Sequence, residues 1–230
     1  MRCNHRDVKR FLFGAVLALL SVAGSRAGSI SGTVSAQGPT TPAETGGGGA
    51  YTSRRYKFVE KIDYEALTDF VINVEGLVAP PAGPAPRIIV QKDATFEPHV
   101  LPIVVGTTVR WPNEDDIFHN VFSMTETQDF NLGFYKKEKV PEVLFDKLGR
   151  VDVFCAIHTN MHCIILVLPN PYFAVADSRR HFVIKDVPAG TYRLRAWQER
   201  LPPQVREITV KADGDSHVDF VLGVAELPKL

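Results

Sequence analysis

The chain has 230 residues, of which 45% are hydrophobic and 23% are charged. These proportions are typical of globular proteins and are sufficient for one large domain or two small ones. Lys plus Arg and Asp plus Glu both number 26, so the formal net charge is zero. The composition therefore lacks the basic bias that marks nucleic-acid-binding proteins, and we expect no nucleic-acid partner.

The first 27 residues have the pattern of a secretory signal peptide. A positively charged start that includes Lys9 and Arg10 precedes an apolar run from Phe11 to Gly24, and Ser25-Arg26-Ala27 offers a small-residue cleavage site. The apolar run has about 14 residues, whereas a membrane-spanning helix needs about 20. We therefore expect residues 1–27 to be removed on export, the mature protein to be periplasmic, and no membrane span to remain.

Residues 28–66 are predicted to form a linker and an N-terminal strand region. Ile30 to Val34 has the composition of a short strand. The segment that follows is rich in Gly, Ser, Thr and Pro and includes Gly46 to Gly49, which is typical of a flexible loop or linker.

Residues 67–169 are predicted to form one domain of short strands. Runs of β-branched and aromatic residues recur about every 8–12 residues with turn signals between them, which favours an all-β sandwich or barrel. The predicted strands are Phe70–Val74, Arg87–Gln91, Val100–Val105, Thr108–Trp111, Asn120–Ser123, Glu142–Phe145, Arg150–Cys155 and Ile164–Leu168.

Residues 170–230 are predicted to form a second, smaller β-sandwich. Pro169-Asn170-Pro171 marks the boundary, and apolar residues alternate with others from Tyr192 to Trp197, as in strands with one buried face. About 55 residues of strands are few for an independent core. We therefore expect this unit to pack on the first domain or to borrow the strand at Ile30–Val34.

The segment Cys155-x-x-His158-x-x-Met161 places a thiolate, an imidazole and a thioether on one loop between two predicted strands. His119, at the start of an upstream strand, can add a second imidazole. One Cys and two His with a weak axial Met form the ligand set of blue-copper electron-transfer sites, in which soft sulfur ligands favour Cu(I) and imidazoles also accept Cu(II). The sequence therefore predicts one copper ion bound by these four residues, with Asn120 tying the two ligand segments together.

An alternative use of the cysteines stays open at this point. Once Cys3 is removed with the signal, Cys155 and Cys163 remain, and exported proteins often pair their cysteines in disulfides. Such a bond would remove the thiolate from the proposed site. His99 and His162 lie near the ligand segments, but the sequence favours neither as a further ligand.

The ligand segments resemble a known family. Gly106 to Asn113, followed by His119-Asn120-Val121, is similar to the strand and first ligand of the cupredoxins, and the Cys155 to Met161 loop is similar to the short ligand loop of their amicyanin/plastocyanin-like members. The resemblance covers about Ile88 to Leu168. It implies a Greek-key sandwich with copper at one end that exchanges single electrons with redox partner proteins in the periplasm.

Two further comparisons with known families refine this expectation. Thr159 and Asn160 stand where amicyanin has Pro and Phe, which belong to an apolar docking patch, so a methylamine dehydrogenase partner is not implied. Tyr172 to Leu222 resembles, more weakly, the carboxypeptidase regulatory-like sandwich, which is usually structural or adhesive. The whole layout is similar to plastocyanin-like proteins that carry a methylamine-utilisation label.

Three functions follow as hypotheses. The favoured one is a copper electron carrier, which makes or breaks no substrate bond and is therefore not an enzyme. The alternatives are a copper carrier or sensor of the cell envelope that uses the same ligands, and a copper-free structural β-sandwich module. A multicopper oxidase is disfavoured because seven His in all do not supply the additional trinuclear site.

Overall fold

The computed structural model describes residues 27–38, 62–76 and 83–223, and all of the structure described is β-structure and connecting loops. The expected signal peptide, apart from Ala27, and most of the expected linker lie outside these residues. Within the described ranges, no helix has the length and apolar composition needed to cross a membrane. The all-β class predicted from the sequence is confirmed.

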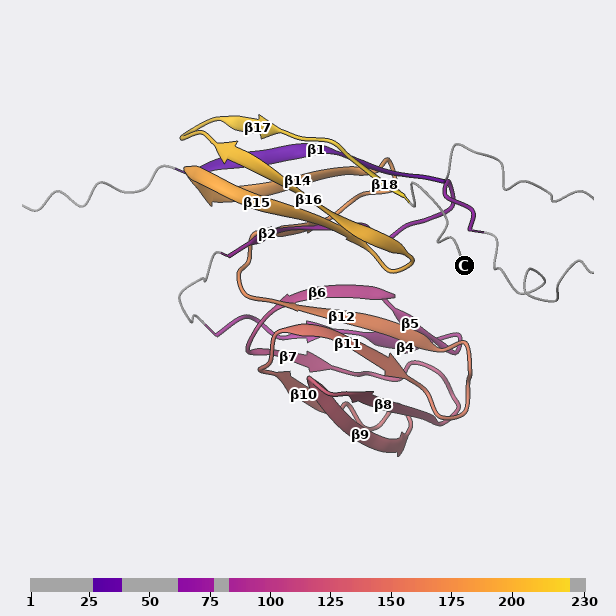
Figure 1. Ribbon diagram of the computed structural model, residues 1–230. Helices are drawn as coiled ribbons and strands as arrows, with labels where there is room; N and C mark the ends of the chain where they lie inside the picture. Colours follow the sequence, from indigo (N-terminus) through magenta and orange to yellow (C-terminus); the bar gives the residue numbers. More distant parts are fainter. Residues whose placement is uncertain (1–26, 39–61, 77–82, 224–230) are drawn as a thin grey trace, which may run out of the picture.

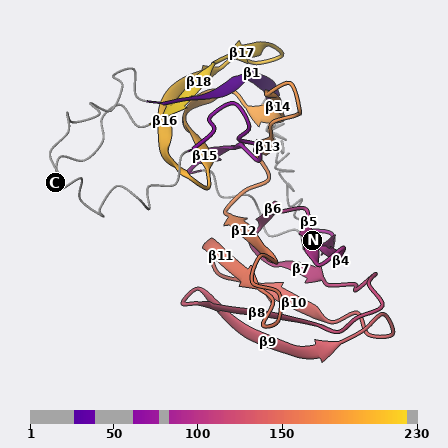
Figure 2. The same ribbon diagram turned by 90° about the vertical axis from the view of Figure 1, so that its right-hand side faces the viewer.

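The strands form two sandwiches, which Figures 1 and 2 show as separate groups that meet along one side. In the first sandwich, a five-stranded sheet has the order β6-β12-β11-β8-β9 and faces a three-stranded sheet of order β10-β7-β3, with a hairpin of β4 and β5 beside them. The strands are β3 (Arg87–Ile88), β4 (Val90–Lys92), β5 (Thr95–Glu97), β6 (Val100–Val104), β7 (Thr107–Arg110), β8 (His119–Thr125), β9 (Gln128–Tyr135), β10 (Glu142–Phe145), β11 (Gly149–Phe154) and β12 (His162–Leu168).

The second sandwich contains two four-stranded sheets. One has the order β14-β1-β17, with β18 also pairing with β1, and the other has the order β13-β2-β15-β16. The strands are β1 (Ala27–Gln37), β2 (Val71–Glu75), β13 (Phe173–Val175), β14 (His181–Pro188), β15 (Gly190–Gln198), β16 (Leu201–Val210), β17 (Asp215–His217) and β18 (Phe220–Gly223).

Strand β1 completes the second sandwich, as the small size of that unit suggested. Its side chains alternate between partly exposed and buried, and Ile30 and Val34 are both 0% exposed in the core. It pairs with β14 on one side and with β17 and β18 on the other. A strand from the N-terminal region therefore supplies a central element of the C-terminal unit.

The expected domain boundary at residue 67 needs correction. Strand β2 was expected in the first sandwich, but it pairs with β13 and β15 of the second. Four of its five residues are buried, and Ile72 and Val74 pack in the same core as Ile30. An apolar run of this kind is equally compatible with either sandwich, so its pattern alone does not assign it to a sheet.

The two sandwiches share a small apolar contact. Val71 and Trp197 of the second sandwich pack with Val100, Ile164 and Leu166 of the first, and all five are less than 10% exposed. This contact lies along β6 and β12, at the edge of the five-stranded sheet. It holds the end of β15 against the first sandwich.

Candidate metal centre

His119 is the first residue of β8, and its side chain is 0% exposed. The loop that leads into it is held by Asn113, whose Nδ2 donates hydrogen bonds to the carbonyl oxygens of Ile117 at 3.0 Å and Tyr135 at 3.1 Å. Asn113 is itself buried. The position of the imidazole is therefore set by a buried hydrogen-bonded loop.

Asp115 orients the His119 ring. Its Oδ2 lies 2.8 Å from Nε2 of His119, and the carboxylate also accepts hydrogen bonds from the backbone amides of Asp93 at 2.8 Å and Ala94 at 3.0 Å. Burial acts to raise the pKa of Asp115, but the hydrogen bonds from Ala94, His119 and Asp93 outweigh it and lower the pKa below its usual value. An ionised Asp115 accepts a hydrogen bond from Nε2–H of His119, which leaves Nδ1 of the ring with a lone pair for a metal ion.

Three of the predicted ligands lie on one short loop between β11 and β12. The backbone amide of Cys155 donates to the carbonyl oxygen of Met161 at 3.1 Å, and the amide of Met161 donates to the carbonyl oxygen of His158 at 3.0 Å. The strands on either side are joined by the pair Phe154 and His162. These contacts close the loop, so that the residues at its two ends lie side by side.

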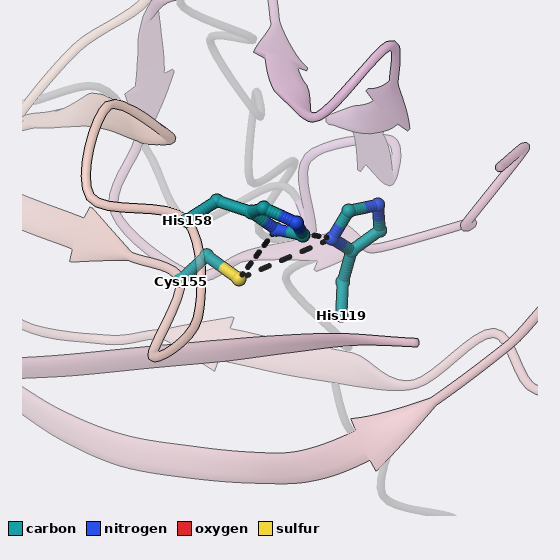
Figure 3. Close-up of side chains that lie close together, drawn as sticks. All are labelled: His119, Cys155 and His158. Carbon is teal, nitrogen blue, oxygen red and sulfur yellow. Dashed lines mark hydrogen bonds between the residues drawn. The ribbon is translucent and has the colours of Figure 1, made fainter. Parts of the chain in front are cut away.

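The loop and β8 bring a thiol and two imidazole nitrogens together, as Figure 3 shows. Nδ1 of His119 lies 3.1 Å from Nδ1 of His158, and the Cys155 Sγ lies 3.6 Å from Nδ1 of His158 and 4.0 Å from Nδ1 of His119. Metal bonds are about 2.0–2.1 Å to histidine nitrogen and about 2.3 Å to thiolate, so donors sharing one ion lie at most about 4.4 Å apart. All three distances satisfy this limit, and the donor set fits a single copper ion.

Met161, the fourth predicted ligand, is 1% exposed and packs in the same core cluster as Cys155. Among the three converging donors, His119 is 0% exposed and Cys155 is 6% exposed, whereas His158 is partly exposed. The site is thus closed on the side of the core, and His158 lies on its more exposed side.

The alternative disulfide between Cys155 and Cys163 is wrong for this structure. Both residues are buried free thiols. Cys163 pairs with Val153 across β11 and β12, and burial together with the negative charge of Asp152 raises the pKa of its thiol well above the usual value. Cys163 is therefore a neutral thiol of the core.

The predicted role of Asn120 is not the one that the structure shows. Its Nδ2 donates to Oδ1 of Asn131 in β9 at 2.8 Å, so it fixes a strand pair and not the two ligand segments. Asp115 is the residue that supports His119. Its position four residues before His119 is the signal that could have found it, but an acidic residue in a loop is ordinarily a surface turn residue.

Comparison with known proteins gives partial matches. Residues 170–218 match a family model described as polysaccharide lyase family 4, domain II. This is a different family from the carboxypeptidase regulatory-like one that the sequence resembles, and it spans only part of the chain. No curated protein is significantly similar to the chain.

The chain is also similar to solved cupredoxin structures. A purple cupredoxin from Nitrosopumilus maritimus is 26% identical over 35% of this chain and 98% of its own, with a TM-score of 0.32. A Cu-containing nitrite reductase from Thermus scotoductus is 26% identical over 42% of this chain and 25% of its own, with a TM-score of 0.36. A Cu(I) form of an amicyanin variant is 20% identical over 42% of this chain and 97% of its own, with a TM-score of 0.34. With TM-scores this low, these likenesses identify no function.

Proposed function

We propose that this chain is an exported blue-copper protein of the cupredoxin type that carries single electrons in the periplasm. His119, Cys155 and His158 would hold the copper as its strong ligands, and the thioether of Met161 would be a weaker fourth ligand. The observation that carries the proposal is the convergence of one buried thiol and two Nδ1 atoms, with separations of 3.1 to 4.0 Å. A thiolate with two imidazoles is the donor set that suits copper in electron transfer.

A bound copper ion supplies a one-electron couple between Cu(I) and Cu(II). The residues of the chain provide a rigid and largely dry surrounding for it. Asp115 holds the His119 ring in one orientation, and the buried side chains of His119 and Cys155 exclude water. Because the donors are held in place before any ion binds, they need little movement between the two oxidation states.

His158 provides the route to the protein surface in this proposal. It is the most exposed of the three converging donors, so an electron leaves through its imidazole. Phe118 and Ile157, each next to a ligand in the sequence, are both 52% exposed. We propose that a redox partner protein contacts these apolar side chains, while the exposed Thr159 and Asn160 give the contact a polar part.

Electron transfer at this centre makes or breaks no bond of a substrate, so we propose no enzymatic activity. The second sandwich serves as a structural support, in keeping with the carboxypeptidase regulatory-like sandwiches that it resembles.

Addition of Cu(II) to the purified mature protein tests the proposal. We expect one equivalent to bind with an intense visible band from thiolate-to-copper charge transfer, and we expect voltammetry to show a chemically reversible one-electron couple. A protein that binds Cu(I) without a reversible couple would be a copper carrier or sensor. A protein that binds no copper would be a structural module. Either result contradicts an electron carrier.

A second prediction concerns the residue that orients His119. Asp115→Asn is expected to lower the copper affinity about 10- to 100-fold, as is typical when the hydrogen-bond partner of a metal-bound histidine is lost. The matched control is Asp116→Asn, because the Asp116 side chain is 92% exposed and pairs with a surface residue, Lys137, at 2.6 Å. Competition with a copper chelator measures both affinities. Equal affinities in the two variants would show that Asp115 does not position the ligand.

A further inference from the structure

A second group of metal-ligating side chains lies where the two sandwiches meet. His99 directly precedes β6, His162 is the first residue of β12, and Glu199 follows β15 of the second sandwich. One ligand atom from each of the three lies within 4.8 Å of the other two. His162 lies between Met161 and Cys163, which point into the core, so strand alternation turns its ring towards the opposite face.

The outer ring nitrogen of each histidine already has a hydrogen-bond acceptor. Nδ1 of His99 lies 3.1 Å from the carbonyl oxygen of His162, and Nε2 of His162 lies 3.2 Å from Oδ1 of Asp152. Metal-bound histidines almost always donate their second ring N–H to a carbonyl or carboxylate in this way. Nε2 of His99 and Nδ1 of His162 are therefore the ring nitrogens placed to bind an ion.

Both of these nitrogens face the same carboxylate. Nε2 of His99 forms a hydrogen bond of 2.9 Å with Oε2 of Glu199, in which a bound ion would replace the proton, and Nδ1 of His162 lies 3.9 Å from Oε1. A metal ion binds histidine nitrogen at about 2.0–2.1 Å and carboxylate oxygen at about 2.0–2.2 Å, so donors sharing one ion lie up to about 4.3 Å apart. Both distances are within this range.

The charges around the cluster favour a cation. Glu199 and Asp152 each carry a negative charge, and Arg150 carries the positive charge that partly offsets them. Nη2 of Arg150 lies 2.6 Å from Oδ1 of Asp152 and 3.8 Å from Oε1 of Glu199, so its closer ion pair is with Asp152. With neutral histidines, the group has a net charge of about −1, which attracts a divalent ion.

We propose that His99, His162 and Glu199 bind a divalent first-row transition metal ion, with Zn²⁺ as the simplest probe, at a site separate from the copper centre. Two histidines and one carboxylate form a common ligand set for such ions, with further positions open to water. The three side chains are 40%, 21% and 26% exposed, so an ion can enter from solvent. Because Glu199 comes from the second sandwich, the ion joins the two sandwiches beside their apolar contact.

Zinc binding to the metal-free mature protein tests this proposal by equilibrium dialysis and metal analysis. We expect Glu199→Gln, which keeps the size of the side chain, and His99→Asn to weaken binding of one zinc equivalent at least 10-fold. The control is His217→Asn, because His217 also lies near a carboxylate, with 3.2 Å between its Nε2 and Oδ2 of Asp219, but is 62% exposed. This variant is expected to bind zinc as the wild type does.

The experiment does not depend on the copper proposal. The measured quantity is the difference in bound zinc, one equivalent per protein, between the wild type and Glu199→Gln. Zinc that binds at the Cys155 site is present in both proteins and does not change this difference. Thermal unfolding provides a second measurement: zinc is expected to raise the unfolding midpoint of the wild type more than that of Glu199→Gln. Equal zinc content and equal midpoint shifts in both proteins would show that the cluster only forms hydrogen bonds between the sandwiches, and would overturn the proposal.

Discussion

Cys155→Ser is expected to remove the intense visible band of the copper-loaded protein completely. The band requires a thiolate bound to copper, and a serine hydroxyl at the same position is not ionised at neutral pH. The imidazoles of His119 and His158, whose Nδ1 atoms lie 3.1 Å apart, are expected to retain Cu(II) more weakly, with only the weak absorption of a nitrogen and oxygen site. Visible absorption after addition of one equivalent of Cu(II) measures the effect.

Cys163→Ala is the matched control for this prediction. Cys163 is also a buried cysteine, eight residues later, but its thiol is neutral because burial raises its pKa. Its removal is expected to leave the band unchanged and to cost about 1 kcal/mol of stability for the cavity. If the band survives Cys155→Ser, or disappears in Cys163→Ala, then Cys155 is not the cysteine that binds copper.

Gly32→Ala is expected to have the largest effect on stability, lowering the free energy of unfolding of the second sandwich by about 3 kcal/mol or more. Gly32 lies in β1 between β14 and the segment that leads to β18. A Cβ atom there would lie 1.8 Å from the carbonyl oxygen of Val218 and 3.1 Å from the ring of Phe182. Since the closest atom belongs to the backbone, the clash is relieved only by moving the backbone of β1 or of the segment at Val218.

Urea unfolding followed by circular dichroism measures this change. Gly214→Ala is the control from the same sandwich, because the nearest atom to its added Cβ lies 3.5 Å away, and it is expected to be nearly neutral. The copper centre lies in the other sandwich, so the visible band of Gly32→Ala is expected to remain. Equal stability of Gly32→Ala and Gly214→Ala would contradict the central position of β1 in the second sandwich.

The all-β class and three of the four proposed copper ligands were accessible to reasoning from sequence because they depend on local patterns. Cys155, His158 and Met161 are spaced so that one loop can carry them all. The runs of apolar and β-branched residues on either side of the loop identify the flanking segments as strands. The meeting of His119 with Cys155 and His158 was also predicted, and the structure brings these side chains together. Copper binding itself stays a prediction.

The assignment of β2 could not be predicted in the same way. The burial of nearly all its positions shows only that β2 lies inside a sandwich. The residues that decide which sandwich are its partners in β13 and β15, which come 100 to 126 positions later in the chain. The pairing of β1 with the C-terminal unit could, by contrast, be predicted from the sequence, because that unit has too few strands for a core of its own.

The sequence by itself thus determined the strand pattern and the chemistry of the ligand loop, since both follow from residues that are close together along the chain. Only the tertiary structure decided the sheet to which β2 belongs, the carboxylate that orients His119, and the grouping of His99 with His162 and Glu199. The contacts in that group join residues 63 and 100 positions apart. Such contacts depend on how two sandwiches pack against each other, and no short-range pattern of residue types encodes that packing.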